Sequence, residues 1–217
     1  MLTRLTAPLA FAATALLLAG CARNGEIDVT SGVGITASRT VCPAVGIPAH
    51  TGDITLFDPP QSRDAAAIDV VAAITNLRTT CNPDGAQVYS TTSFDVVASR
   101  LRAGPAREVV IPYYSAVVQG GTQIVSKDES RLVVRFEDGQ TRATARGQVG
   151  AYVDRASATL SDDIRQRITR QRRAGDQDAA VDPLADPEVR AAVARATFEV
   201  FLGFALTRDQ LAYNVTR

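Results

Sequence analysis

The sequence predicts an α+β protein in which a mainly antiparallel β-sandwich comes first and helices come last. Between residues 52 and 154, apolar and polar residues alternate with a period of two in short runs that Gly, Pro and Asn interrupt. After Asp154 the apolar residues recur every three or four positions, which is the helical spacing. A chain of 217 residues is long enough for one sizeable domain, and strands followed by helices favour the α+β class.

The longest predicted strands form a hairpin of residues 68–80 and 88–101. Between them, Asn82-Pro83-Asp84-Gly85 has the composition of a tight turn, because Pro restricts φ and Gly accepts a positive φ. The other predicted strands cover residues 53–57, 108–119, 123–126, 131–136 and 141–153. Pro112 indicates an edge strand or a bulge within 108–119. About seven closely spaced strands are typical of an immunoglobulin-like sandwich, although the chain has no Trp for its usual core position.

The C-terminal segment, residues 155–217, is predicted to be helical and to pack on the sandwich domain of residues 41–154. A first helix begins near Ser161, and Asp186-Pro187-Glu188 has the residues expected at the start of a second helix. The apolar residues that predict this second helix are Val189, Val193, Ala196, Val200 and Phe204, with Phe198 and Phe201 widening the stripe. Any part of Phe198, Phe201 and Phe204 left uncovered would be a candidate partner patch. A capping box at Thr207–Gln210 predicts a last short helix.

The N-terminus has the pattern of a secretory signal. Arg4 precedes an apolar run from Leu5 to Ala19 that is too short for a membrane span, which needs about 20 residues. The run ends in Leu18-Ala19-Gly20-Cys21, which matches the bacterial lipobox, so over residues 1–21 the chain resembles bacterial envelope lipoproteins. The resemblance implies removal of residues 1–20, a diacylglycerol with palmitate-type chains on the Cys21 thiol, and acylation of the new amine. The alternative is an ordinary cleaved signal followed by a chance cysteine.

The lipobox resemblance also predicts a location. In such lipoproteins Ala22, in place of Asp, implies delivery to the outer membrane, with the domain facing the periplasm; the inner membrane and the cell surface are alternatives. Membrane lipid is then the partner of Cys21. Residues 21–40 form the lipidated cysteine and a tether, part of which could instead be an edge strand because Ile27, Val29, Val33 and Ile35 alternate.

Cys42 and Cys81 remain once Cys21 carries lipid, and we predict a disulfide between them because secreted proteins favour disulfides. The bond would close a loop of about 40 residues and contribute roughly 4 kcal/mol in the chain-entropy account. Two free buried thiols are the alternative. These two cysteines and the lone His50 do not make a four-ligand zinc site, so no metal or cofactor is expected.

The charge pattern excludes a global field for nucleic acid, because 23 basic residues balance 23 acidic ones. One basic cluster is a candidate anion-binding site, since guanidinium groups match oxyanions. It consists of Arg165, Arg167, Arg170, Arg172 and Arg173. An acidic segment follows over residues 176–188, so the alternative is a solvated helix whose charges are compensated locally.

The sequence lacks the usual signatures of catalysis. It has a single histidine, no Gly-x-Ser-x-Gly motif and no Gly-rich phosphate loop. Four aspartates near a proline turn could act in a hydrolase or bind calcium, but acidic residues are also common in turns for local hydrogen-bonding reasons. These are Asp53, Asp58, Asp64 and Asp69.

The sequence therefore predicts a non-enzymatic protein. The first hypothesis is an adaptor or accessory subunit of an envelope assembly, with an envelope protein as its partner. The alternatives are a small-ligand or lipid-binding module and, third, a carboxylate-based hydrolase.

Overall fold

The computed structural model describes residues 40–170, 172, 175–178 and 180–216. The predicted signal peptide, the predicted lipidation site at Cys21 and the predicted tether, up to residue 39, lie outside the described residues. The chain divides into two compact units, one made of Thr36–Arg170 and Asp182–Arg217 and the other of Met1–Ile35 and Gln171–Val181. The strands and helices below all belong to the first unit.

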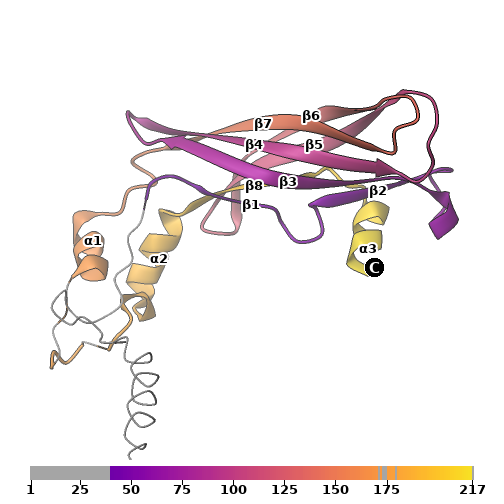
Figure 1. The fold of residues 1–217 in the computed structure, drawn as a ribbon. Helices are drawn as coiled ribbons and strands as arrows, with labels where there is room; N and C mark the ends of the chain where they lie inside the picture. Colours follow the sequence, from indigo (N-terminus) through magenta and orange to yellow (C-terminus); the bar gives the residue numbers. More distant parts are fainter. Residues whose placement is uncertain (1–39, 171, 173–174, 179, 217) are drawn as a thin grey trace, which may run out of the picture. The chain divides into compact units, whose positions relative to one another are not determined.

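The described residues form a mainly β fold of eight strands in two four-stranded sheets (Figure 1). Sheet I has the order β1-β8-β5-β6, and sheet II has the order β2-β3-β4-β7. The strand bounds are Ala44–Gly46 (β1), Asp53–Phe57 (β2), Ile68–Asn82 (β3), Gln87–Arg100 (β4), Arg107–Gln119 (β5), Gln123–Phe136 (β6), Arg142–Asp154 (β7) and Phe198–Phe204 (β8). All pairs are antiparallel except β1 with β8, the first strand with the last.

The alternating segments of the sequence form the strands that they predict. The hairpin of β3 and β4 is confirmed, and Gly85 in its turn has a φ of 87°. The two short strands predicted at residues 123–126 and 131–136 are one continuous strand, β6, which pairs with β5 along its length. Backbone pairing with β5 therefore continues through the polar residues that separate the two apolar runs.

The core lies between the inner faces of the two sheets. Its largest fully buried side chains include Phe94 of β4, Phe136 of β6 and Phe204 of β8. Phe94 lies directly over Gly147 of β7, where a Cβ would come within 2.3 Å of the ring. The cross-strand position next to Phe94 therefore has room only for glycine.

The predicted helix over residues 186–206 is wrong in its second half. Helix α2 (Pro187–Arg195) begins as predicted, with the Asp186 carboxylate accepting hydrogen bonds from the backbone N–H groups of Glu188 and Val189. The chain leaves the helix after Ala196, and Phe198–Phe204 is β8. β8 pairs with β1 on one side and with β5 on the other, so it is an interior strand of sheet I.

Of the edge or bulge predicted within residues 108–119, the edge is wrong, since β5 lies between β8 and β6, whereas the register of β5 with β6 does shift between Val117 and Val118. β8 pairs with β5 only from Tyr113 onward, and the Pro112 carbonyl accepts a hydrogen bond from the N–H of Ala205 just beyond β8. Pro112 has no N–H to donate toward β8, but β8 has already ended at Phe204. The β5–β8 pairing therefore loses no hydrogen bond at Pro112.

The helices pack at opposite ends of the sandwich (Figure 1). α1 (Asp162–Thr169) and α2 bury Ile164, Ile168, Val189 and Val193 in a small cluster of their own. α3 (Arg208–Thr216) begins with the predicted capping box and lies against β2, where Tyr213 packs edge-on against Phe57. No helix of the described residues is long and apolar enough to cross a membrane.

The predicted disulfide is present: Cys42 and Cys81 are bonded, with their Cα atoms 6.1 Å apart. Cys42 lies just before β1 in sheet I, and Cys81 lies near the end of β3 in sheet II. Both pack against a buried cluster that includes Val88, Val117 and Val200. The bond therefore joins the two sheets at the point where the N-terminal segment enters the sandwich.

Candidate functional site

A shallow groove on the outer face of sheet II is the candidate site. Its volume is about 330 Å³, and it is lined by Ile68, Val71, Ser99, Arg100, Leu101, Thr141 and Arg142. Val71 of β3 is the direct cross-strand partner of Ser99 of β4, and Ser99 is that of Arg142 of β7. These three side chains therefore form one row across three strands.

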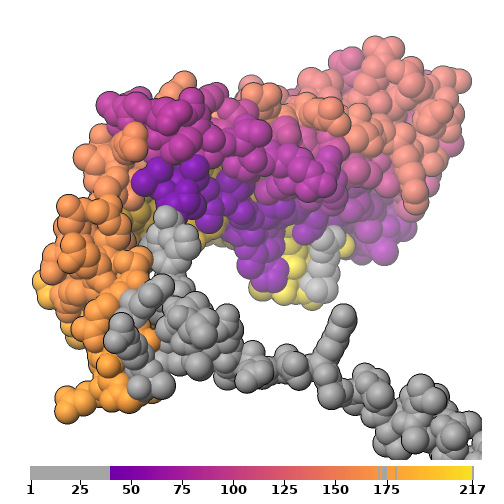
Figure 2. Space-filling view, turned by 60° about the vertical axis from the view of Figure 1, so that its left-hand side comes forward, coloured from indigo at the N-terminus to yellow at the C-terminus, as the bar shows by residue number. Residues whose placement is uncertain are grey.

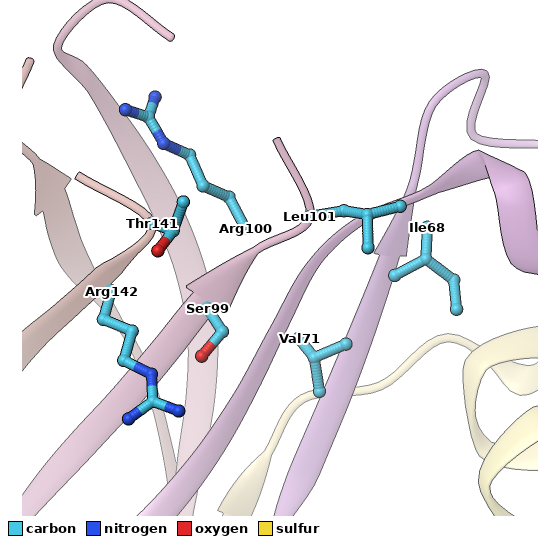
Figure 3. Close-up of a pocket in the computed structure, with 7 residues that line it drawn as sticks. All are labelled: Ile68, Val71, Ser99, Arg100, Leu101, Thr141 and Arg142. Atoms are coloured by element: carbon cyan, nitrogen blue, oxygen red, sulfur yellow. The ribbon is translucent and has the colours of Figure 1, made fainter. Parts of the chain in front are cut away.

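The two ends of the groove differ in chemistry (Figure 3). Leu101 and Ile68 lie together at one end, Arg142 lies at the other, and Ser99 lies between them. Leu101 is 58% exposed, an unusually open position for a leucine. Within the described part of the chain, the Arg142 guanidinium has no hydrogen bond or ion pair. The groove thus combines an apolar end with an available cation.

Arg100 forms the frame of this groove and does not face the solvent. Its side chain points away from Ser99 and Leu101 (Figure 3), and the residue is 5% exposed. The guanidinium donates hydrogen bonds to the carbonyls of Gln140, Pro105, Gly104 and Glu137, at 2.5 to 3.2 Å, and lies over the Phe136 ring. It therefore holds the loop after β4 and the β6–β7 turn in one arrangement.

A second polar cluster lies on the same outer face. Asp95 of β4 accepts a hydrogen bond from the Asn76 amide at 2.8 Å and another from the Arg146 guanidinium at 3.0 Å. Asn76 has a φ of 54° and lies where the register of β3 shifts, so this bond fixes a bulge. The Asn76 amide, and next the Arg146 guanidinium, hold the pKa of the Asp95 carboxyl below its ordinary value of 3.8.

The outer face of sheet I carries an exposed apolar pair among charged residues. Val110 of β5 and Val133 of β6 are direct partners, 53% and 47% exposed, and Glu108 and Arg135 are the next outward pair. Farther along the same face, Tyr114 and Phe201 are half-buried, and the Lys127 ammonium lies over the Tyr114 ring. The outer face of sheet II is also mixed, with exposed apolar residues (Tyr89, Val97 and Tyr152) among polar ones that include Thr75, Arg78, Thr80, Thr91, Ser93, Thr144, Arg146 and Gln148.

Most of the predicted anion-binding arginines bind carboxylates of their own chain. Arg165 pairs with Asp162 at 2.5 Å, and Arg167 pairs with Asp186 and Glu188. The hydrogen bond to Glu188, and next the charges of the nearby carboxylates, raise the pKa of Arg167. Arg170 is exposed and also has a partner. In the other unit Arg172 lies 3.5 Å from Asp178, and Arg173 lies outside the described residues. These contacts are those expected for the alternative interpretation, in which carboxylates of the same chain compensate the charge of the arginines.

The three phenylalanines of the predicted partner patch do not lie on one face. Phe198 and Phe204 point into the core and are 7% and 1% exposed, whereas Phe201 is on the outer face of sheet I. In a strand, residues an odd number apart lie on opposite faces, so a patch of all three is wrong.

The residues considered for catalysis are also dispersed. His50 is exposed in the loop before β2, Asp58 and Asp64 are exposed, and Asp69 pairs with Arg107 at 2.6 Å. Across residues 40–170 and the described positions that follow, no three His, Cys, Asp or Glu side chains gather in a way that could hold a metal ion.

The groove residues themselves were not singled out from the sequence. Arg142, Ser99 and Val71 are far apart along the chain, and only the register of three strands brings them into a row. The available signal was Leu101, an apolar residue at the end of a strand where a turn residue is usual.

Comparison of the chain with protein-family models, with curated proteins and with solved structures finds no match.

We predict that the Asp95 cluster makes stability depend on acid. Because the folded pKa of Asp95 is lowered, its ionised form stabilises the fold at pH values above the unfolded pKa, and this contribution is lost as the pH falls through the folded value. Asp95→Asn should therefore lower the melting temperature by a few degrees at pH 7, and the difference should become smaller as the pH falls below 3.8.

The matched control is Asp128→Asn, an exposed carboxylate of β6 for which the described residues provide no hydrogen bond or ion pair. Thermal unfolding followed by circular dichroism across this pH range measures both. An Asp95→Asn effect that persists unchanged at pH 3 would show that the carboxylate charge is not the cause.

Proposed function

We propose that this protein is a lipid-anchored envelope lipoprotein whose sandwich faces the periplasm and serves as a non-enzymatic adaptor or accessory subunit of an envelope assembly. The observation that carries the proposal is the sequence Leu18-Ala19-Gly20-Cys21 at the end of a short apolar run. Two or three acyl chains on Cys21 would make release from the membrane negligible, because each buried CH₂ contributes about 0.8 kcal/mol. Ala22 favours the outer membrane.

The Cys42–Cys81 bond supports an extracytoplasmic location independently of the lipobox. Disulfides form and persist in oxidising compartments such as the bacterial periplasm and are rare in the cytosol.

The adaptor role is supported by the outer face of sheet I. A sheet covered on one side only is expected to alternate between apolar and polar residues. Val110, Tyr114, Val133 and Phe201 depart from this pattern on the side away from the core. The layout of two four-stranded sheets is compatible with an immunoglobulin-like sandwich, a fold that often serves in assemblies, but this is an analogy of fold alone.

The groove on sheet II favours a second candidate function, a small-ligand or lipid-binding module, and its ligand is considered in the next subsection. A carboxylate-based hydrolase is the third alternative, and no contact of the four aspartates favours it.

The anchor is tested by Cys21→Ser in a bacterial host that processes lipoproteins. We expect loss of labelling by radioactive palmitate and accumulation of uncleaved precursor or soluble protein. Cys42→Ser is the control, because it removes a thiol without touching the lipobox and should keep the label. Mature Cys21→Ser protein that stays with membranes at high salt would contradict the proposal.

The adaptor role is tested by placing a photo-crosslinking amino acid at Val133, on the outer face of sheet I, in living cells. We expect one discrete crosslinked species, identified by mass spectrometry as an envelope protein. The same probe at Thr144, an exposed position on sheet II, should give none. Equal crosslinking from both positions, or only from Thr144, would remove the basis for assigning the contact to sheet I.

A further inference from the structure

We propose that the groove on sheet II binds a single-chain amphiphile with an anionic head group, of which a fatty-acid carboxylate is the simplest case. The head group contacts Arg142 and Ser99, and the chain lies across Val71 toward Leu101 and Ile68 (Figure 3). This inference goes beyond the proposed function and does not depend on the membrane anchor.

The strand register sets the length of the site. Val71, Ser99 and Arg142 are successive cross-strand partners on β3, β4 and β7. Neighbouring strands are about 4.8 Å apart, so the row spans roughly 10 Å from the apolar end to the cation. A ligand must therefore carry its charge at one end, with an extended apolar part of similar length.

The charge of the groove favours an anion. Three arginines on the strands have carboxylate partners: Arg107 binds Asp69 at 2.6 Å, Arg146 binds Asp95 at 3.0 Å, and Arg135 binds Glu137 at 2.9 Å. Arg142 has no such partner within the described residues. Asp69, the carboxylate on the strand that carries Ile68 and Val71, is already bound to Arg107, so it does not neutralise Arg142.

The apolar end gives the chain of the ligand a surface to cover. Leu101 is 58% exposed, and Val97, on the same outer face of β4, is 40% exposed. Covering such side chains releases water from apolar surface, which is favourable in proportion to the area covered. A volume of about 330 Å³ is at the small end of ligand sites, which matches one short chain.

The groove is held in shape before any ligand arrives. Arg100 ties the loop after β4 to the β6–β7 turn through four carbonyls, and the N–H of Leu101 donates to the Asp69 carbonyl at 3.0 Å. Leu101 and Arg142 therefore keep their separation, and binding does not have to order the backbone.

The space-filling view shows that the face of the molecule turned toward the reader carries several strand segments of the sandwich in one continuous surface (Figure 2). The ligand lies on this surface without deep enclosure, because the row of side chains across β3, β4 and β7 provides the contact.

The test uses the purified full chain and a diazirine-bearing octanoate as photoprobe. We expect labelling on peptides that contain Leu101 or Ile68, with octanoate as an effective competitor and octanol and octylamine as poor ones. Octyl phosphate is a further competitor: if it exceeds octanoate, the natural head group is a phosphate, and if it is weaker, a carboxylate. Either result supports an anionic amphiphile.

The variants locate the contacts. Arg142→Gln should weaken octanoate competition about three- to tenfold, the range expected for one partly exposed charge-assisted contact. Arg78→Gln is the matched control, because Arg78 is an exposed cation on the outer face of the same sheet. Leu101→Ser should weaken labelling and leave the melting temperature almost unchanged, since Leu101 is mostly exposed.

Three results would overturn the proposal. The first is octanol competing as well as octanoate, which would mean that the cation is not used. The second is Arg142→Gln behaving like Arg78→Gln, and the third is labelling of the unmodified chain that does not map to the groove.

Discussion

The fold depends on one non-local constraint: β8, near the C-terminus, occupies the interior of sheet I between β1 and β5. Its seven residues pair with Gln119 to Tyr113 on one side and with Ala44–Gly46 on the other. Without β8, β1 would have no partner in sheet I, and Phe204 and Leu202 would leave the core. The disulfide acts at the same place, because Cys42 precedes β1 and is bonded to Cys81 of the opposite sheet.

The position of β8 explains both the success and the failure of the sequence-based predictions. The strands from β2 to β7 could be predicted because apolar and polar residues alternate along them, or because the strand ends at a turn of recognisable composition. β8 could not, because Val200 and Phe204 are four residues apart, a spacing that is common to a helix and to one face of a strand. Phe201 on the other face then filled the apparent helical stripe. A strand with apolar residues on both faces has no periodicity that separates it from a buried helix.

The groove could not be predicted for a different reason. Arg142, Ser99 and Val71 have unremarkable sequence neighbours, and their proximity follows from the register of two strand pairs. By contrast, the Asp186 cap of α2 and the Thr207–Gln210 capping box are local features, and both were predicted correctly. A helix cap can be predicted from a few consecutive residues. A site assembled from several strands can be predicted only once the pairing and register of those strands are known.

The two outer faces of the sandwich carry different exposed apolar residues, and the proposed roles are assigned accordingly. Sheet I has the Val110–Val133 pair, proposed as a protein contact, and sheet II has one amphipathic groove. β8 completes sheet I, whose inner face covers that of sheet II, so the most direct test is to compare the stability of Phe204→Ala and Phe201→Ala. In a strand these two side chains lie on opposite faces, whereas in a helix they would lie on nearly the same face. The structure predicts that Phe204→Ala, which empties a fully buried position, lowers the free energy of unfolding by about 3–5 kcal/mol, and that Phe201→Ala costs only a fraction of this. Equal losses for the two variants in denaturant unfolding would contradict the placement of β8.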